Sequence, residues 1–293
     1  MGIWRWSDWL IELPADARQT LGEGDTALVR SHAIGPSVGL KNLYFKLETG
    51  NPTGSYKDRF AVGAISDMVA KGKRRCIATS SGNTGSALAA YCAVVPQMTC
   101  QIAVLEKTPL GKLQQMMAYG AKIYRVRGMG LDPRVSNETI RVLQQLSDRP
   151  DTALQISAFR FSPAGMTCVQ SISYELAEQI DGRIDHVFSP AGGGGLTLAV
   201  ARGFDVLVAH GRLDVGAKIE CVQPEGNNTM AGPLREGADQ AVAVTCTSQI
   251  SGLQVGSVID GDETLAACRR TGGTGHVISD EAIWHAQARM ARE

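Results

Sequence analysis

The chain has 293 residues, of which 44% are hydrophobic and only 5% aromatic, and its 29 basic and 29 acidic side chains give a formal net charge of zero. A neutral chain has no field that would attract nucleic acid or an anionic membrane, so we expect neither as a partner. No apolar run reaches the roughly 18 residues of a membrane-spanning helix. The N-terminal segment that begins at Met1 lacks the features of a secretory signal or a myristoylation site, so we expect a cytoplasmic protein.

The seven cysteines show no C-x-x-C motif and no metal-type spacing. Their number is odd and their neighbours are mostly apolar, which is typical of reduced core residues in an intracellular protein. We therefore expect no metal site. The cysteines are Cys76, Cys92, Cys100, Cys168, Cys221, Cys246 and Cys268.

From about residue 41 onward, short apolar runs alternate with Ala-rich helical patterns. Such alternation with short loops predicts an α/β fold with mostly parallel sheets, covered by helices on both faces in three layers. Strands are expected at 43–47, 76–79, 101–105, 122–126, 153–156, 187–189 and 219–222, and helices at 56–70, 85–94, 110–119, 137–147, 166–180, 195–210 and 262–270. The tryptophans Trp4, Trp6 and Trp9 are expected to anchor the N-terminal segment.

The segment from Asn51 to Arg59 carries a lysine, Lys57, in the first turn of an expected helix. Asn-Pro-Thr-Gly precedes it as a turn, and small and apolar residues follow it. An amine that is partly shielded at a strand-to-helix junction can serve as a nucleophile. An exposed lysine near a helix start would have the same local sequence.

Two further loops join an expected strand to a helix, at the edge of a parallel sheet where ligands bind. Residues 79–85 (Thr-Ser-Ser-Gly-Asn-Thr-Gly) could bind a carboxylate through hydroxyls and N–H groups, or could simply cap the helix. Residues 189–196 contain the four glycines from Gly192 to Gly195, which predict a phosphate site more than a flexible turn. The pattern lacks the motifs of ATP and dinucleotide sites.

Together the three loops resemble, in order and type, those of the fold-type II pyridoxal-phosphate enzymes (the tryptophan synthase β superfamily), and the lysine segment resembles the threonine synthase-like group. The resemblance implies that Lys57 binds pyridoxal 5'-phosphate as a Schiff base and moves the proton of the substrate α-carbon. Asn83 would contact the phenolic oxygen of the cofactor. The phosphate would be held by Gly192, Gly193, Gly194, Gly195 and Leu196, and the substrate carboxylate by Ser80, Ser81, Gly82 and Thr84.

The resemblance also implies two domains with the cofactor between them. Residues 1–40 and 156–293 would form the large cofactor-binding domain, and residues 41–155 a smaller, mobile domain carrying Lys57 and the Asn83 loop. A homodimer is expected, because similar enzymes are usually dimers. The resemblance also implies that family members continue for roughly another 50 residues past the position of Glu293, a part that includes a final strand.

The expected reaction is a β- or γ-elimination or replacement on a small amino acid, with O-phosphohomoserine, the precursor of threonine, as one candidate. Threonine synthases commonly carry E-G-x-K-T where this chain has Thr167 to Ser171, and the four-glycine loop is closer to serine/threonine dehydratases and β-replacement enzymes. An unphosphorylated amino acid substrate is therefore the alternative, and a non-catalytic cofactor-binding relative is another. Arg160 and Lys112 are the first candidates for contacting an anionic substrate group.

Overall fold

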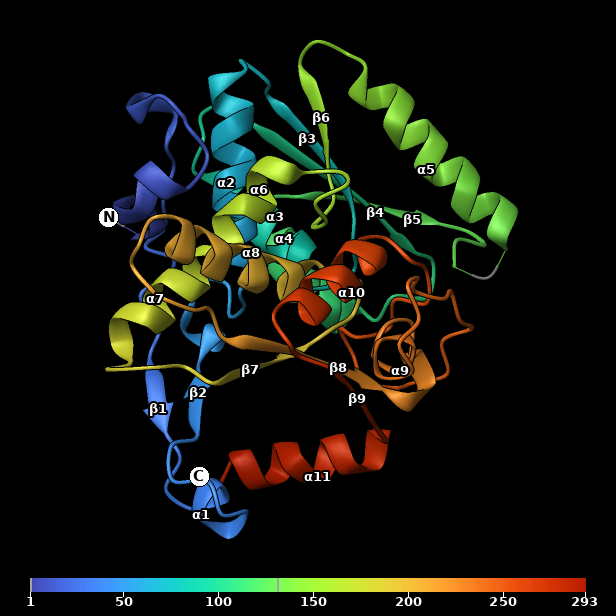
Figure 1. The fold of residues 1–293 in the computed structure, drawn as a ribbon. Helices are drawn as coiled ribbons and strands as arrows, with labels where there is room; N and C mark the ends of the chain where they lie inside the picture. The colour runs from blue at the N-terminus through green and yellow to red at the C-terminus, as the bar shows by residue number, and fades with distance from the viewer. Residues whose placement is uncertain (1, 131) are drawn as a thin grey trace. The chain divides into compact units, whose positions relative to one another are not determined.

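The computed structural model describes residues 2–130 and 132–293 (Figure 1). Met1, with which the N-terminal segment begins, lies outside the described residues. The chain forms two compact units, and it passes between them three times. Unit 1 contains residues 2–24 and 49–169, and unit 2 contains residues 25–48 and 170–293. The sequence predicted a division into residues 41–155 and residues 1–40 with 156–293. It assigned the cofactor to the second part and mobility to the first, and this division stays a prediction.

The core of unit 1 is a sheet of four parallel strands in the order β5-β4-β3-β6. Each strand was predicted to within two residues, because its apolar run is bounded by polar or glycine-rich turns. In this register Cys76 of β3 lies opposite Cys100 of β4. The strands are β3 (Arg75–Thr79), β4 (Thr99–Leu105), β5 (Lys122–Val126) and β6 (Thr152–Gln155).

Helices cover both faces of this sheet, as predicted for a parallel α/β sheet. On one face Ile77 packs with Ala103 and with Leu143 of α5. On the other face Cys76 lies beside Cys92 of α3, because successive side chains of a strand point to opposite faces. The helices of unit 1 are η1 (Gly2–Trp9), η2 (Ala15–Ala17), α2 (Lys57–Ala70), α3 (Asn83–Ala93), α4 (Leu110–Ala118), α5 (Pro133–Ser147) and α6 (Pro163–Val169).

Helices α2 and α6 approach each other closely at two glycines. A Cβ on Gly63 would lie 2.5 Å from the sulfur of Cys168, and a Cβ on Gly165 would lie 2.7 Å from the ring of Phe60. This contact covers the side chain of Phe60, which is fully buried, as is that of the neighbouring Arg59. It therefore fixes the helix that begins with Lys57.

The core of unit 2 is a parallel sheet in the order β7-β8-β9, accompanied by an antiparallel pair, β1-β2. The run 43–47, expected in the parallel alternation, instead pairs antiparallel with β1, since the connecting segment contains only a four-residue helix and not the longer crossover helix that parallel strands use. Strand β9 was not predicted, because its four residues are preceded only by glycine-rich sequence. The strands are β1 (Leu28–Arg30), β2 (Tyr44–Lys46), β7 (His186–Pro190), β8 (Lys218–Pro224) and β9 (Gly275–Ile278).

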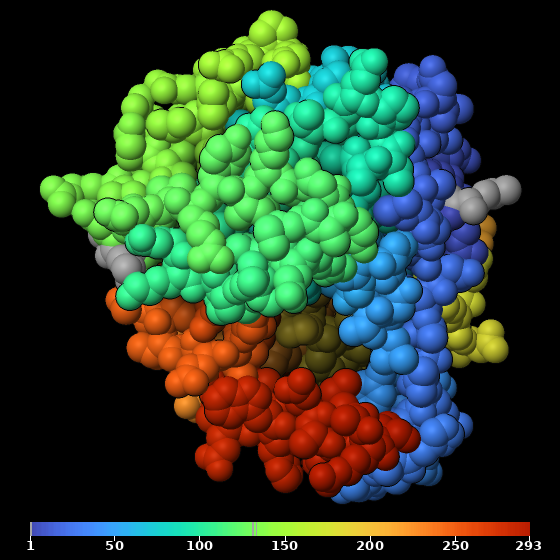
Figure 2. All heavy atoms as spheres, turned by 180° about the vertical axis from the view of Figure 1, so that it is seen from behind, coloured from blue at the N-terminus to red at the C-terminus, as the bar shows by residue number. Residues whose placement is uncertain are grey.

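The expected helix 166–180 is instead two helices, α6 and α7, on either side of Gln170. Figure 2 shows the C-terminal residues (red) against the segment around α1 (blue), where the Glu293 carboxylate accepts hydrogen bonds from the N–H groups of Ala33 at 3.0 Å and Ile34 at 2.9 Å. No helix among the described residues combines the length and apolarity needed to cross a membrane. The remaining helices are α1 (Ile34–Ser37), α7 (Ser171–Gln179), α8 (Gly195–Ala209), η4 (Glu225–Asn227), α9 (Ala231–Arg235), α10 (Gly261–Arg270) and α11 (Asp280–Met290), with η3 (Glu48–Gly50) at the passage between the units.

Candidate active site

Lys57 is the first residue of α2, as predicted, and its side chain is half-buried. Its amine donates a hydrogen bond to the hydroxyl of Tyr56 and lies 4.1 Å from the centre of that ring. The turn before it is closed by a hydrogen bond of 2.8 Å from the N–H of Gly54 to the carbonyl of Asn51. The amide oxygen of Asn51 also accepts from the N–H of Gly24 at 2.9 Å, which ties the turn to the N-terminal segment.

Asp58, the next residue, holds the turn to the helix from inside. Its carboxylate is fully buried and accepts hydrogen bonds from the N–H of Thr53 at 3.2 Å and from its hydroxyl at 2.8 Å. Burial raises the pKa of Asp58 to about 6, although the hydrogen bonds from Thr53 act in the opposite direction. Both ends of the turn that presents Lys57 are therefore fixed.

Buried polar groups continue behind Asp58. The hydroxyl of Tyr91 donates a hydrogen bond of 2.7 Å to the buried carboxylate of Glu23. Burial, followed by the charge of Glu23, raises the pKa of Tyr91, so the phenol stays protonated and remains a donor. Arg59 supplies a buried positive charge near these acids. No local sequence pattern predicts this group of buried polar residues, because its members are far apart in the chain.

The second predicted loop follows β3 and leads into α3 at Asn83, whose side chain is exposed together with Gly82. The hydroxyl of Ser80 accepts a hydrogen bond from the N–H of Gly82 at 3.3 Å. Ser81 is half-buried, whereas Thr84 is buried. An N–H-rich helix start beside hydroxyl groups is suited to binding a carboxylate.

Helix α4 holds the lysine turn and the Ser80 loop through neighbouring residues. The side-chain amide of Gln115 donates a hydrogen bond of 3.3 Å to the carbonyl of Thr53. The sulfur of Met116 lies against Gly85, where an added Cβ would be 2.9 Å from it. Because Gln115 and Met116 are adjacent, neighbouring residues of α4 contact the Lys57 turn and the start of α3.

Sequence reasoning missed Ser157, which follows β6 at the same edge of the sheet. Its hydroxyl lies 3.0 Å from the hydroxyl of Thr84. Strand β6 pairs with β3, so residues after both strands are brought together. Its position could have identified it, because Ser157 directly follows the expected strand 153–156, at the edge of the sheet where ligands bind.

In unit 2, the predicted glycine loop joins β7 to the start of α8 at Gly195. Among the described residues, the backbone N–H groups from Gly192 to Leu196 donate no hydrogen bond. Gly194 has φ +92°, and a Cβ there would lie 2.4 Å from the hydroxyl oxygen of Thr264. Unpaired N–H groups at the N-terminus of a 15-residue helix fit a phosphate group.

The glycine loop is held from beneath by Gln223 of β8, a second residue that sequence reasoning missed. Its buried side-chain NH₂ donates to the carbonyls of Ala191 and Gly192 at 3.3 Å each, and its oxygen accepts from the N–H of Met230 at 2.7 Å. A glutamine inside an apolar strand is a buried polar group that needs partners. A glutamine within an apolar run could therefore have identified Gln223 from the sequence.

The other sequence candidates lie outside these two loops. Lys112 and Arg160 are exposed residues of unit 1. In unit 2, the carbonyl of Gly252, within the loop 249–253, would lie 3.1 Å from a Cβ on Gly192. That loop therefore borders the glycine loop.

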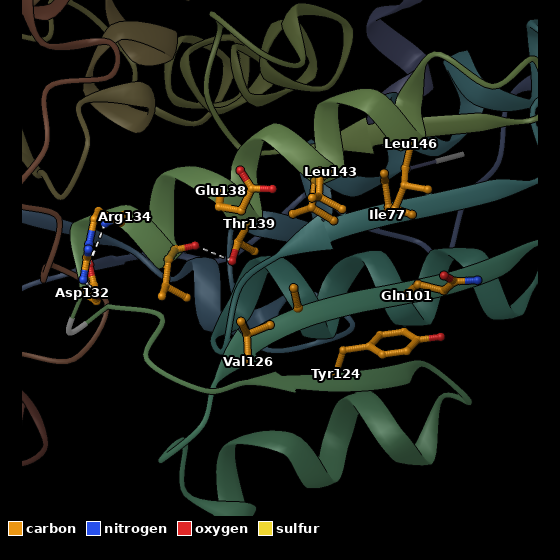
Figure 3. A pocket seen from close by; sticks show the side chains of 13 residues that line it. Ile77, Gln101, Tyr124, Val126, Asp132, Arg134, Glu138, Thr139, Leu143 and Leu146 are labelled. Carbon is orange, nitrogen blue, oxygen red and sulfur yellow. Dashed lines mark hydrogen bonds and ion pairs between the residues drawn. The ribbon is translucent and has the colours of Figure 1, made fainter.

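A cavity of about 810 Å³ lies elsewhere in unit 1, between α5 and strands β3, β4 and β5 (Figure 3). Its walls are mostly apolar and include Ile77 and Leu143, and the ion pair between Asp132 and Arg134, at 3.1 Å, lies at one end. None of the predicted site residues lines it. The cavity therefore does not belong to the predicted site.

Comparison with known proteins gives the class of the chain. A family model described as "Pyridoxal-phosphate dependent enzyme" matches residues 19–293, and the chain belongs to this family. The predicted family, fold class and cofactor, pyridoxal 5'-phosphate, are thereby confirmed.

Its curated relatives include two threonine synthases. That of Methanocaldococcus jannaschii is 28% identical over 295 residues, which cover 100% of this chain and 71% of the relative. That of Methanosarcina acetivorans is 28% identical over 275 residues, covering 93% of this chain and 66% of the relative. This chain therefore spans about two thirds of their length.

Solved structures with a similar fold carry other activities in their names. They include the processed form of threonine deaminase isoform 2 from Solanum lycopersicum (TM-score 0.71, 21% identity, 94% of this chain and 74% of that one). Serine racemase from Dictyostelium discoideum is another (TM-score 0.69, 24% identity, 90% of this chain and 78% of that one). At these identities the likeness concerns the fold alone.

Proposed function

We propose that this chain is a pyridoxal-phosphate-dependent lyase of the threonine synthase-like group, acting on a small amino acid by β- or γ-elimination or replacement. The observation that carries the proposal is the pair of prepared sites: a lysine fixed at the start of α2, and unpaired N–H groups at the start of α8. Similarity to threonine synthases over 100% of the chain supports the same assignment.

Each end of the cofactor has residues that would hold it. The N–H groups of Gly192, Gly193, Gly194, Gly195 and Leu196 would bind its phosphate, and Asn83 its phenolic oxygen. Lys57 would bind its aldehyde carbon. When bound, the cofactor supplies an electron sink for the pair released from the substrate α-carbon.

The protein would orient the substrate and move its proton. Ser80, Ser81, Gly82 and Thr84 would hold the substrate carboxylate, with Ser157 fixing the hydroxyl of Thr84. The amine of Lys57 would then take the proton from the α-carbon and return it later. Proton transfer by a positioned side chain contributes roughly 10²–10⁴-fold to rate.

The test uses purified protein supplied with pyridoxal 5'-phosphate and reduced with borohydride, followed by peptide mass spectrometry. We expect the reduced adduct on the peptide that contains Lys57, with no adduct there in Lys57→Ala. Lys71→Ala is the matched control, because Lys71 lies just after the same helix and its amine pairs with Asp67 at 2.8 Å. Protein that takes up no cofactor would refute the proposal.

The substrate is tested in the same protein. Phosphate release from O-phosphohomoserine with formation of threonine would establish the phosphorylated substrate. Keto acid formation from serine or threonine would establish the dehydratase alternative. Cofactor uptake without turnover on a broad amino acid panel would identify a non-catalytic relative and would overturn the lyase assignment.

The homodimer that the resemblance implies and the expected cytoplasmic location belong to the same proposal. Sedimentation of the cofactor-loaded protein measures the first, and fractionation of cells that express the chain measures the second. A monomeric active protein would refute the dimer.

A further inference from the structure

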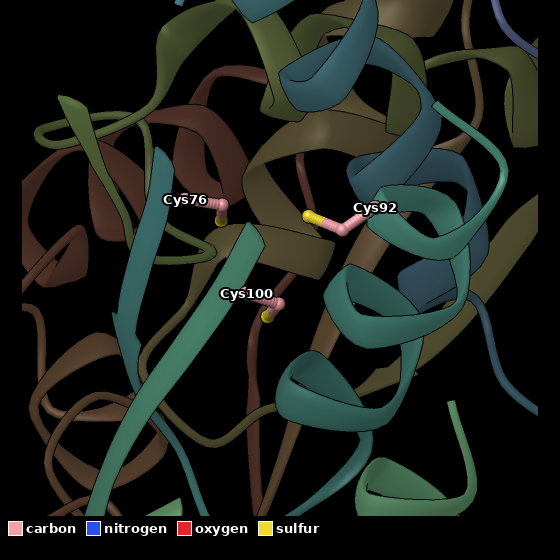
Figure 4. A group of neighbouring side chains, drawn as sticks. All are labelled: Cys76, Cys92 and Cys100. Carbon is pink, nitrogen blue, oxygen red and sulfur yellow. The ribbon is translucent and has the colours of Figure 1, made fainter. Parts of the chain in front are cut away.

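Three cysteines that are spread along the sequence converge in the core of unit 1 (Figure 4). Cys76 of β3, Cys92 of α3 and Cys100 of β4 place their sulfur atoms within 4.8 Å of one another. Their relative exposures are 0%, 1% and 5%. The sequence spacing of these residues matches no metal motif, and only the packing of α3 on the sheet brings them together.

The cluster lies away from the predicted active site. Cys76 and Cys100 are the second residues of their strands, whereas the Ser80 loop follows the last residue of β3. Cys92 is the second-last residue of α3, whose first residue is Asn83. The three thiols therefore lie at the base of the strand–loop–helix segment, and the substrate loop lies at its other end.

The number of ligands restricts what these thiols could bind together. Zinc takes four ligands in structural sites, and the group of converging His, Cys, Asp and Glu ligands described here contains only the three cysteines. Three sulfurs that each lie about 2.3 Å from a central atom are separated by roughly 4 Å or less. The three sulfurs lie within 4.8 Å of one another, so small side-chain movements would bring them close enough to bind one central atom together.

The charge of the three thiolates also restricts which ion they could bind. Three thiolates carry three negative charges, so a monovalent or divalent ion would leave a net negative charge in a fully buried site. Burying an uncompensated charge is strongly unfavourable. A trivalent centre gives a neutral complex.

We propose that Cys76, Cys92 and Cys100 form a binding site for a trivalent, thiol-seeking centre of the arsenite class. Arsenous acid, As(OH)₃, is uncharged, and it reacts with three thiols to form three As–S bonds. Its three hydroxyl groups leave with the three thiol protons as three water molecules, so no oxidant or reductant is needed. The product is a neutral As(S–Cys)₃ centre.

Binding would link β3, α3 and β4. A ligand that binds only the folded state increases the free energy of unfolding, so bound protein should resist heat better. Entry requires the end of α3 to open, because the sulfurs are buried. Binding should therefore be slow, and faster under mild denaturant, which favours local opening.

The experiment adds arsenite to the reduced, full-length protein and measures intact mass under non-denaturing conditions. We expect one adduct whose mass gain equals one arsenic atom less three hydrogens, together with the loss of three titratable thiols. An adduct that keeps a hydroxyl on arsenic would indicate two sulfurs and would overturn the three-thiol site. Binding of zinc in preference to arsenite would also overturn it.

Substitution locates the site. Cys92→Ala should abolish the three-thiol adduct and its rise in melting temperature, and alanine is well tolerated in a helix. Cys168→Ala, at an equally buried cysteine of unit 1 outside the cluster, should leave both unchanged. The same three-thiol adduct on Cys92→Ala, or on the unfolded chain, would contradict the proposal. Circular dichroism confirms that each variant is folded.

Discussion

The buried carboxylate of Asp58 accepts hydrogen bonds from both the N–H and the hydroxyl of Thr53, five residues earlier in the chain. This pair closes the turn that leads into Lys57. It uses a carboxylate whose burial raises its pKa to about 6. Positioning Lys57 therefore carries a free-energy penalty at neutral pH, which other parts of the fold offset.

That penalty gives the first prediction. The pKa of Asp58 is about 6 in the folded protein, against an ordinary value of 3.8, so the folded state binds the extra proton between these values. Its stabilising effect is present below about pH 4 and is lost as pH rises through 6. Relative to Asp58→Asn, the wild type should lose on the order of 2–3 kcal/mol of unfolding free energy between about pH 4 and about pH 7. Urea denaturation of both proteins across this range measures the difference, and parallel pH profiles would contradict the prediction.

The second prediction concerns the glycine loop of unit 2. Gly194→Ala introduces a Cβ at φ +92° and 2.4 Å from the hydroxyl oxygen of Thr264, so the loop must shift. We expect affinity for pyridoxal 5'-phosphate to fall at least about tenfold, since losing one hydrogen bond to a charged group costs roughly 1.5–3 kcal/mol.

Gly182→Ala is the control for that variant. It has nearly the same φ, +95°, but nothing lies within 4 Å of its added Cβ. Both variants should lose about 1 kcal/mol of stability from backbone strain, and only Gly194→Ala should bind cofactor poorly. Equal cofactor affinity in a titration of the two variants would show that the loop does not hold the phosphate.

The third prediction concerns the contact between α2 and α6. Gly63→Ala places a Cβ 2.5 Å from the sulfur of Cys168, so we expect destabilisation by about 1–3 kcal/mol. Gly111→Ala, in α4 with nothing within 4 Å, should instead stabilise by up to about 1 kcal/mol. Guanidinium unfolding of both variants shows whether packing or helix propensity dominates at Gly63. Helix propensity alone would make both variants more stable.

The fourth prediction concerns Glu220 in unit 2. Burial alone would raise the pKa of this carboxylate, but hydrogen bonds from the N–H of Thr274 at 2.8 Å, from His186 at 2.8 Å and from His276 at 3.0 Å outweigh it and lower the pKa. The stabilising effect is therefore present above the ordinary value of 4.5 and is lost as pH falls below it. Glu220→Gln should cost about 1–2 kcal/mol at pH 7.

Thermal unfolding at several pH values checks this effect. The difference between wild type and Glu220→Gln should shrink in acid. Glu225→Gln, at an exposed glutamate just after β8, should be neutral throughout. A difference that is constant with pH would mean that the carboxylate charge contributes nothing.

The sequence by itself determined most of the strands and helices, because hydrophobic periodicity and the glycine and proline turns act over a few neighbouring residues. It also predicted a binding role for single loops. Lys57 begins a helix, and the four glycines from Gly192 leave N–H groups unpaired, as local sequence requires. These properties need no information from distant parts of the chain.

Only the tertiary structure decided how distant residues share one place. It set Ser157 against Thr84, placed Gln223 under the glycine loop, and gathered Cys76, Cys92 and Cys100. Strand order, the antiparallel pairing of β2 and the approach of α2 to α6 depend on which surfaces pack together. Such packing is an energy of the whole fold, so no local pattern in the sequence records it.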